Sequence, residues 1–373
     1  MPVSIPLFKT HLPPNAHLAV KATIETGQLA LGANVAEFEK RLGAWSGANR
    51  VCGISDVSGA LTLALYVSGV RPGDEVILSP MTCLATSMPV ANLFAVPVWC
   101  DVDARTGMMD ASLLQNLITK RTRAIVVFHW SGDVANLAKL RDVATRAGIP
   151  LIEDASEAFG AEFQGARIGC GTADFTVMSF GAVRQLTCGE GAAISVSDDS
   201  HFDSLQKLRR YGINSASFRL PNGDLNPASD IPVAGFNFPM NNIAATIGLE
   251  QFHDIDTLVQ RYRENGAYFQ NALADIPGIT LLARQEDAIS GYWTYSMRAK
   301  RRDDLVRKLV VNGIGSQRLH LRNDKYSCFA SSISKNPLPG VDIFDQENIS
   351  VPCGWWVGPR ERESIVSCIR AGW

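Results

Sequence analysis

The chain has 373 residues, a length that favours two domains over a single hydrophobic core. Hydrophobic residues make up 46% and charged residues 19%, which is typical of a globular enzyme and excludes a disordered chain. The formal net charge is -2 and no basic stripe occurs, so we expect no nucleic-acid partner.

The N-terminal residues show no basic start followed by an apolar run, so we expect no secretory signal peptide. No apolar run approaches the roughly 20 residues that a membrane helix needs, and no membrane partner is expected. The eight cysteines form no CxxC pair and match no zinc spacing. This pattern predicts reduced thiols, no metal site and a cytoplasmic protein.

Short β-rich runs alternate with helical patterns, such as 60–70 and 137–147, in the first half of the chain. The apolar runs are VCGI (51–54), EVILS (75–79), VPVWCDV (96–102), AIVVFHW (124–130), PLIEDA (150–155), FTVMSF (175–180) and AAISVS (192–197). Strands that alternate with helices predict an α/β fold with a mostly parallel sheet. Such sheets bind ligands at the carboxyl ends of their strands.

The second half begins with a polar segment at 214–232, which we interpret as a long loop, and long ordered loops are often functional. A long helix is predicted over about 241–273, and residues 278–373 mix strand and helix patterns. We therefore expect a large domain over 1–240. The rest, 241–373, would hold a linking helix and a smaller α+β domain.

Ser58 and Gly59 stand just before a helical pattern, where free backbone N–H groups and a positive potential could bind a phosphate. Serine is also a common helix cap, and both interpretations stay open. Asp154 ends a predicted strand, where a buried carboxylate needs a partner. The ring nitrogen of pyridoxal phosphate is such a partner, because the carboxylate keeps it protonated. The alternative is a structural aspartate that caps the next loop.

Ser179 ends the predicted strand 175–180, and a loop with Gly189 and Gly191 follows it. These glycines indicate tight turns or a close approach of the backbone. Asn237 lies between two phenylalanines directly before the predicted long helix. Its side chain is either buried and paired or reaches a neighbour.

Together these features resemble the DegT/DnrJ/EryC1/StrS family of pyridoxal-phosphate-dependent nucleotide-sugar aminotransferases. Four strings match the family pattern in this order. They are PGDEVILSPMTCLAT (72–86), IEDASEAFGAEFQGARIG (152–169), MSFGAVRQLTCGEGAA (178–193) and GFNFPMNNIAATIGLEQ (235–251). The resemblance covers nearly the whole chain. It implies the fold-type-I architecture, with a mostly parallel seven-stranded sheet and a smaller C-terminal α+β domain. It also implies amine transfer from a donor such as glutamate to a nucleotide-linked keto sugar.

Carried over by position, Ser58, Gly59 and Ser179 would bind the cofactor phosphate, and Asp154 would hold the pyridine nitrogen. Asn237 would reach the phosphate of the partner subunit's cofactor, so the resemblance implies a homodimer with shared active sites.

Two further positions depart from the family pattern. Cys83 lies where many members place an aromatic ring against the cofactor, and we assign it no catalytic role. Glu157 stands where a glutamine or histidine usually lies beside the cofactor's hydroxyl. A carboxylate there would repel the phenolate oxygen unless it is protonated.

Arg184 occupies the position of the Schiff-base lysine, five residues after Ser179. Arginine stays protonated, so it supplies neither the neutral amine that attacks an aldehyde nor an effective base. The cofactor, pyridoxal or pyridoxamine phosphate, would then be bound without a covalent link. Normal transamination would be abolished or altered. The arginine is either natural or was introduced to stop the reaction.

Three interpretations of function stay open. The chain is an aminotransferase of a keto-deoxy nucleotide sugar, or a pyridoxamine-phosphate-dependent sugar dehydratase, a branch in which histidine replaces the lysine. Alternatively, it is a non-catalytic member that acts as a binding or partner subunit. Candidates for the substrate side are His129, Trp130, His320 and Arg322, with ordinary packing or surface exposure as the alternative.

Overall fold

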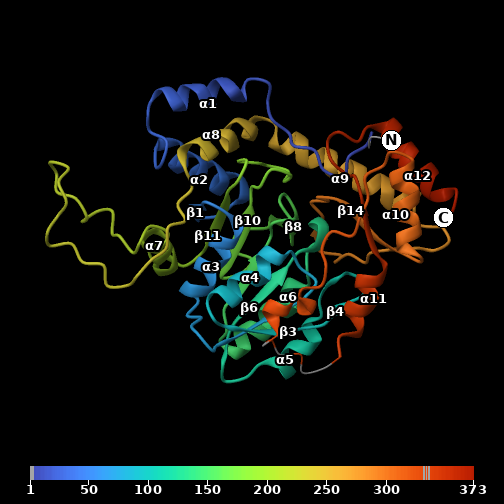
Figure 1. Cartoon of the computed structure of the whole chain (residues 1–373), viewed down its shortest axis with the longest axis horizontal. Helices are drawn as coiled ribbons and strands as arrows, with labels where there is room; N and C mark the ends of the chain where they lie inside the picture. The colour runs from blue at the N-terminus through green and yellow to red at the C-terminus, as the bar shows by residue number, and fades with distance from the viewer. Residues whose placement is uncertain (1–3, 331, 333, 335–336) are drawn as a thin grey trace.

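A large sheet forms the centre of the computed structural model, which describes residues 4–330, 332, 334 and 337–373 (Figure 1). Its strand order is β1-β11-β10-β7-β6-β2-β3, and β11 runs antiparallel to both of its neighbours while the other pairs are parallel. The seven strands coincide with the seven predicted apolar runs, so this prediction is confirmed. They are β1 (Arg50–Ile54), β2 (Glu75–Leu78), β3 (Val96–Trp99), β6 (Thr122–Phe128), β7 (Leu151–Asp154), β10 (Phe175–Ser179) and β11 (Ala192–Val196).

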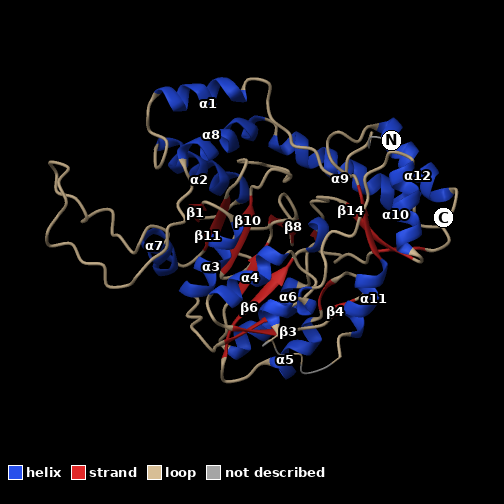
Figure 2. Ribbon diagram, in the orientation of Figure 1, coloured by secondary structure: helices blue, strands red, loops and turns tan. Residues whose placement is uncertain are grey.

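Helices cover both faces of this sheet, as Figure 2 shows. The predicted helical patterns 60–70 and 137–147 correspond to α3 (Val57–Val67) and α6 (Leu137–Ala147). Helix α3 begins earlier than expected, because Asp56 caps it with its side chain. The other helices of this part are α1 (Ala16–Glu25), α2 (Ala33–Ser46), α4 (Leu84–Asn92), α5 (Leu114–Leu117) and α7 (Asp199–Leu208).

The single long helix predicted over 241–273 is wrong. Two helices, α8 (Asn242–Glu250) and α9 (Ile255–Ala272), are separated by a short 3-10 turn at Gln251–His253. The buried Gln251 side chain accepts a hydrogen bond from the Thr187 N–H at 3.0 Å and donates to the Thr187 carbonyl. These hydrogen bonds hold the turn between α8 and α9 against the loop that carries Arg184. Apolar periodicity continues across the turn, so the sequence pattern did not reveal it.

A second hydrophobic core lies at the C-terminal part, around the antiparallel strands β12 (Ile279–Leu281), β14 (Tyr295–Ala299) and β15 (Asn348–Val351). Helices α10 (Arg302–Val311) and α12 (Pro359–Arg370) and the end of α9 complete this α+β unit. Ile5 joins the second core, whereas Phe344 of α11 (Pro339–Glu347) joins the first. The chain thus crosses between the cores, and a domain boundary at 240 stays a prediction.

Short strands form two further sheets. In one, β13 (Ala288–Ile289) pairs with β8 (Glu162–Phe163), which also pairs with β9 (Ala166–Arg167), and in the other β4 (Val102–Asp103) pairs with β5 (Met108–Met109). The predicted loop 214–232 extends away from the rest of the molecule between α7 and α8 (Figure 1). Leu220, Leu225 and Ile231 of this loop are exposed. Within the described ranges, no helix has both the length and the apolar character needed to cross a membrane.

Candidate active site

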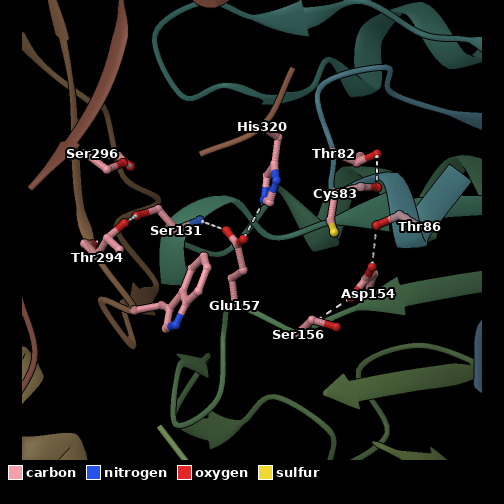
Figure 3. A network of polar contacts seen from close by, with 12 residues as sticks. Thr82, Cys83, Thr86, Ser131, Asp154, Ser156, Glu157, Thr294, Ser296 and His320 are labelled. Carbon is pink, nitrogen blue, oxygen red and sulfur yellow. Dashed lines mark hydrogen bonds and ion pairs between the residues drawn. The ribbon is translucent and has the colours of Figure 1, made fainter. Parts of the chain in front are cut away.

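The carboxyl ends of β6, β7 and β10 meet at one edge of the sheet, and Asp154 lies in the middle of this edge. As the last residue of β7, it pairs with Phe128 of β6 and Val177 of β10. Its side chain is 1% exposed, and burial raises the pKa of its carboxyl. Thr86 Oγ1 donates to Oδ2 at 2.6 Å, and the Ser156 N–H donates to Oδ1 at 3.0 Å (Figure 3).

Asp154 therefore has two neutral donors and no salt bridge to any described residue. A buried carboxylate in this position is stabilised by a cationic partner.

Glu157 is the second carboxylate of the site, and it is fully buried. Its Oε2 accepts from the Ser131 N–H at 2.7 Å, and its Oε1 lies 2.7 Å from His320 Nε2 (Figure 3). Ser131 has φ 59, a left-handed conformation that is uncommon outside glycine. Such conformations persist where the surrounding structure fixes them, often at functional sites. The position of Glu157 beside the cofactor's hydroxyl stays a prediction, and its bond to His320 was not foreseen.

Arg184 is enclosed by residues from three parts of the chain. Its Nη1 lies 3.8 Å from Glu157 Oε1, and its guanidinium carbon lies 4.1 Å from the centre of the Trp293 ring. The backbone N–H of Arg184 donates to the Gly181 carbonyl at 3.1 Å. Nη1 is buried and makes no hydrogen bond to the described residues. The site thus holds a permanent cation beside two carboxylates.

The expected phosphate-binding residues lie at the start of α3 and the end of β10. Ser179 is buried, and its Oγ accepts from the Gly181 N–H at 3.4 Å. Ser58 and Gly59 lie in the first turn of α3 rather than before it. The Gly59 N–H donates to Asp56 Oδ1 at 2.8 Å, so this expected phosphate donor already has a partner within the chain.

Asp56 was missed by the sequence analysis. An aspartate three residues before the N–H that it accepts from is a common helix cap, so the spacing was a usable signal. Its carboxylate adds negative charge at the helix N-terminus. Together with burial, that charge raises the pKa of Glu190.

Cys83 lies at the start of α4, next to the Asp154 carboxylate in the close-up (Figure 3). Burial raises the pKa of its thiol, which makes it a neutral group of the site wall. Asn237 is exposed, and its backbone is paired with that of Arg210. Its predicted reach toward a partner subunit stays a prediction.

The four candidates for the substrate side differ in their surroundings. His129 and Trp130 are fully buried, and Arg322 pairs with Asp324 and Asp342. His129 Nδ1 accepts from the Ala135 N–H at 3.2 Å, and burial lowers its pKa to about 3. Of the four, His320 alone bonds a carboxylate of the site, and the substrate roles stay predictions.

Three further residues support the site without having been predicted. Thr86 bonds Asp154, Trp293 covers Arg184, and Asn323 donates to Ser87 Oγ at 2.8 Å. The last contact fixes the segment that carries His320 against the start of α4. No local pattern marks these residues, because each acts on a distant segment. Among the described residues, no three His, Cys, Asp or Glu side chains gather in a metal-binding group.

Comparisons with known proteins show the family to which the chain belongs. A model of the DegT/DnrJ/EryC1/StrS aminotransferase family matches residues 13–370. Spore coat polysaccharide biosynthesis protein SpsC of Bacillus subtilis (strain 168) is 30% identical over 279 residues, which are 75% of this chain and 72% of its own length.

Two crystal structures superpose on nearly the whole chain. Sugar aminotransferase CalS13 from Micromonospora echinospora has a TM-score of 0.93 and 35% identity, over 99% of this chain and 100% of its own. AtS13 from Actinomadura melliaura has a TM-score of 0.92 and 33% identity, over 99% of both chains. The family model and the two structures cover both the large sheet and the second core.

Proposed function

Because the chain belongs to the DegT/DnrJ/EryC1/StrS aminotransferase family, we propose that it binds pyridoxal or pyridoxamine phosphate non-covalently and acts on a keto-deoxy nucleotide sugar. Its reaction would belong to amino-sugar biosynthesis, with glutamate or a similar compound as amino donor. It is a variant without the Schiff-base lysine, because Arg184 stands in that position.

The observation that carries the proposal is the environment of Asp154. Its carboxylate is buried, has a raised pKa and receives only neutral hydrogen bonds. A protonated ring nitrogen would supply the cationic hydrogen-bond donor that Asp154 lacks among the described residues. When bound, the pyridine ring would supply an electron sink for cleavage of a bond to the substrate carbon.

The remaining groups fit non-covalent binding and do not fit covalent attachment. The Ser58 and Ser179 hydroxyls remain available to a phosphate, whereas the Gly59 N–H is shared with Asp56. The Arg184 guanidinium offers no nucleophilic amine. Its buried Nη1, which has no hydrogen-bond partner in the described chain, could instead donate to an anionic oxygen of the cofactor.

A homodimer with shared active sites is part of the proposal. Asn237 is exposed in the single chain, and the apolar residues of loop 214–232 are exposed as well. A second copy would cover such apolar groups and bring Asn237 to the cofactor phosphate.

The alternative function is a pyridoxamine-phosphate-dependent sugar dehydratase. One contact favours it, the bond between His320 and Glu157, because it brings a histidine to the site where the lysine is missing. A non-catalytic role as a binding or partner subunit is the outcome if no chemistry is found.

Titration of the purified chain with pyridoxamine phosphate and with pyridoxal phosphate tests the cofactor assignment. We expect both to bind, and we expect borohydride to attach neither of them to the protein. Asp154→Ala should abolish binding, whereas the exposed Asp303→Ala should not. The loaded chain is then mixed with nucleoside-diphosphate-linked 3- and 4-keto sugars. Mass spectrometry distinguishes an aminated sugar from a dehydrated one, and failure to bind either cofactor would refute the proposal.

A further inference from the structure

The contact between His320 and Glu157 joins two segments that lie 163 positions apart in the sequence. Glu157 Oε1 lies 2.7 Å from the ring Nε2, and its Oε2 is held by the Ser131 N–H. The imidazole is packed edge-on against the rings of Phe128 and Trp130. Its orientation is therefore fixed by one hydrogen bond and two aromatic contacts.

The carboxylate of Glu157 also determines which ring nitrogen carries the proton. A carboxylate accepts, so Nε2 donates its proton to Glu157 and Nδ1 keeps a free lone pair. Nδ1 makes no hydrogen bond within the part of the chain that the structure describes. The same division of roles, with a carboxylate that orients a basic histidine, occurs in hydrolase triads.

Arg184 leaves the site without the base that the lysine would supply. From the geometry we propose that His320, oriented by Glu157, is the proton-transferring group of this site. The inference rests on the proposed function, since it assigns a base to that reaction. Nδ1 takes the proton from the substrate carbon while the electron pair of the C–H bond stays with the carbon. Nδ1 would then deliver the proton to the carbon on the other side of the linking nitrogen, where the electron pair delocalised from the first carbon forms the new C–H bond.

The charged and titratable groups around His320 come from several elements. Glu157 follows β7, Arg184 follows β10, and Cys83 and Asp154 lie across from the ring in the close-up (Figure 3). On its own segment, Arg318 is paired with Asp345, and Arg322 is paired with Asp324 and Asp342. Glu157 is thus the carboxylate in direct contact with the imidazole.

The experiment measures exchange of the Cα hydrogen of L-glutamate with solvent deuterium by the chain loaded with pyridoxal phosphate. His320→Gln is the main variant, because its amide can still donate to Glu157 but cannot act as a base. We expect the exchange rate to fall about 100-fold or more, the usual range for loss of a general base. His253→Gln changes an exposed histidine outside the site and should exchange like the parent.

A second measurement needs no cofactor. Nuclear magnetic resonance of the 15N-labelled ring shows which nitrogen of His320 carries the proton. We expect the proton on Nε2 in the parent and a loss of this preference in Glu157→Gln, together with a fall in the exchange rate. A structural role for Glu157 alone would leave the position of the proton unchanged.

The outcomes separate this inference from the proposed function. If the cofactor binds but His320→Gln exchanges as fast as the parent, His320 is not the base and the proposed function stands. If the cofactor binds and the parent shows no exchange, the site has no working base and the inference is also wrong. If no cofactor binds, the proposed function fails, and the inference fails with it.

Discussion

The guanidinium carbon of Arg184 lies 4.1 Å from the centre of the Trp293 ring, and the indole N–H of Trp293 donates to the Val183 carbonyl at 2.9 Å. The Trp293 ring, which covers Arg184, is therefore hydrogen-bonded to Val183, the residue just before the arginine. Phe8 stacks on the same indole with 4.8 Å between ring centroids. The surroundings of residue 184 thus hold a cation in a defined place, beside Glu157.

A double-mutant cycle with Arg184→Met and Trp293→Leu measures this contact. We expect a coupling of about 1 kcal/mol in the free energy of unfolding, because the cation–π pair is largely desolvated. Urea unfolding of the parent, the two single variants and the double variant gives the value. In a control cycle, Trp373→Leu replaces Trp293→Leu, because Trp373 packs on the C-terminal unit. We expect the coupling between Arg184→Met and Trp373→Leu to be less than about 0.5 kcal/mol. A Trp293 coupling no larger than the control would show that the stacking does not hold the arginine.

Asp154→Asn should make the cofactor-free chain more stable near neutral pH. Burial raises the pKa of this carboxyl, so the folded state holds its proton more tightly than the unfolded state. The stability that this group contributes is complete below its ordinary pKa and is lost as the pH rises through the folded value. The amide of the Asp154→Asn variant does not titrate and loses no stability in this way. The stability advantage of this variant over the parent should therefore shrink as the pH falls. Urea unfolding at several pH values checks this.

The same variant should bind pyridoxamine phosphate about 10- to 100-fold more weakly, because a charge-assisted hydrogen bond to the ring nitrogen is lost. Thr86→Val serves as the matched control, since it removes one neutral donor and keeps the charge. If Asp154→Asn gains stability but keeps its full affinity for pyridoxamine phosphate, Asp154 does not bond the ring nitrogen of the cofactor.

The sequence predicted what depends on local pattern. Each strand of the large sheet was visible as an apolar run, and Asp154 stood at the end of one of these predicted strands. The break at Gln251 was not visible, because it arises from a contact with Thr187 in another segment. The bond between Glu157 and His320 also joins distant segments. Asp56 was different, since its capping position could be read from the sequence.

Mixing two inactive variants tests the shared site of the proposed homodimer. Asn237→Ala should damage the partner's cofactor site, and Asp154→Ala should damage its own. A mixed dimer would then carry one site with both defects and one intact site. We expect pyridoxamine phosphate binding to return, to at most one site per dimer. Sedimentation of the parent at micromolar concentration provides the control, and a monomer there would contradict the prediction.

Arg184→Lys tests whether the rest of the site still suits a covalently bound cofactor. A neutral lysine amine can attack the aldehyde of pyridoxal phosphate, whereas a guanidinium cannot. We expect borohydride to attach the cofactor to residue 184 in this variant only, as peptide mass mapping would show. The parent and Arg184→Gln are the matched controls, and both should release all of their cofactor on denaturation.

If Asp154 and the serine hydroxyls are competent, Arg184→Lys should also transfer an amine from glutamate to a nucleotide-linked keto sugar. Covalent binding without any transfer, over a panel of 3- and 4-keto sugars, would favour a binding or partner subunit. Covalent attachment in the parent would show that another residue supplies the amine. The two measurements are independent, because attachment requires only the amine. Transfer also requires a substrate pocket and a base, and with lysine restored that base need not be His320.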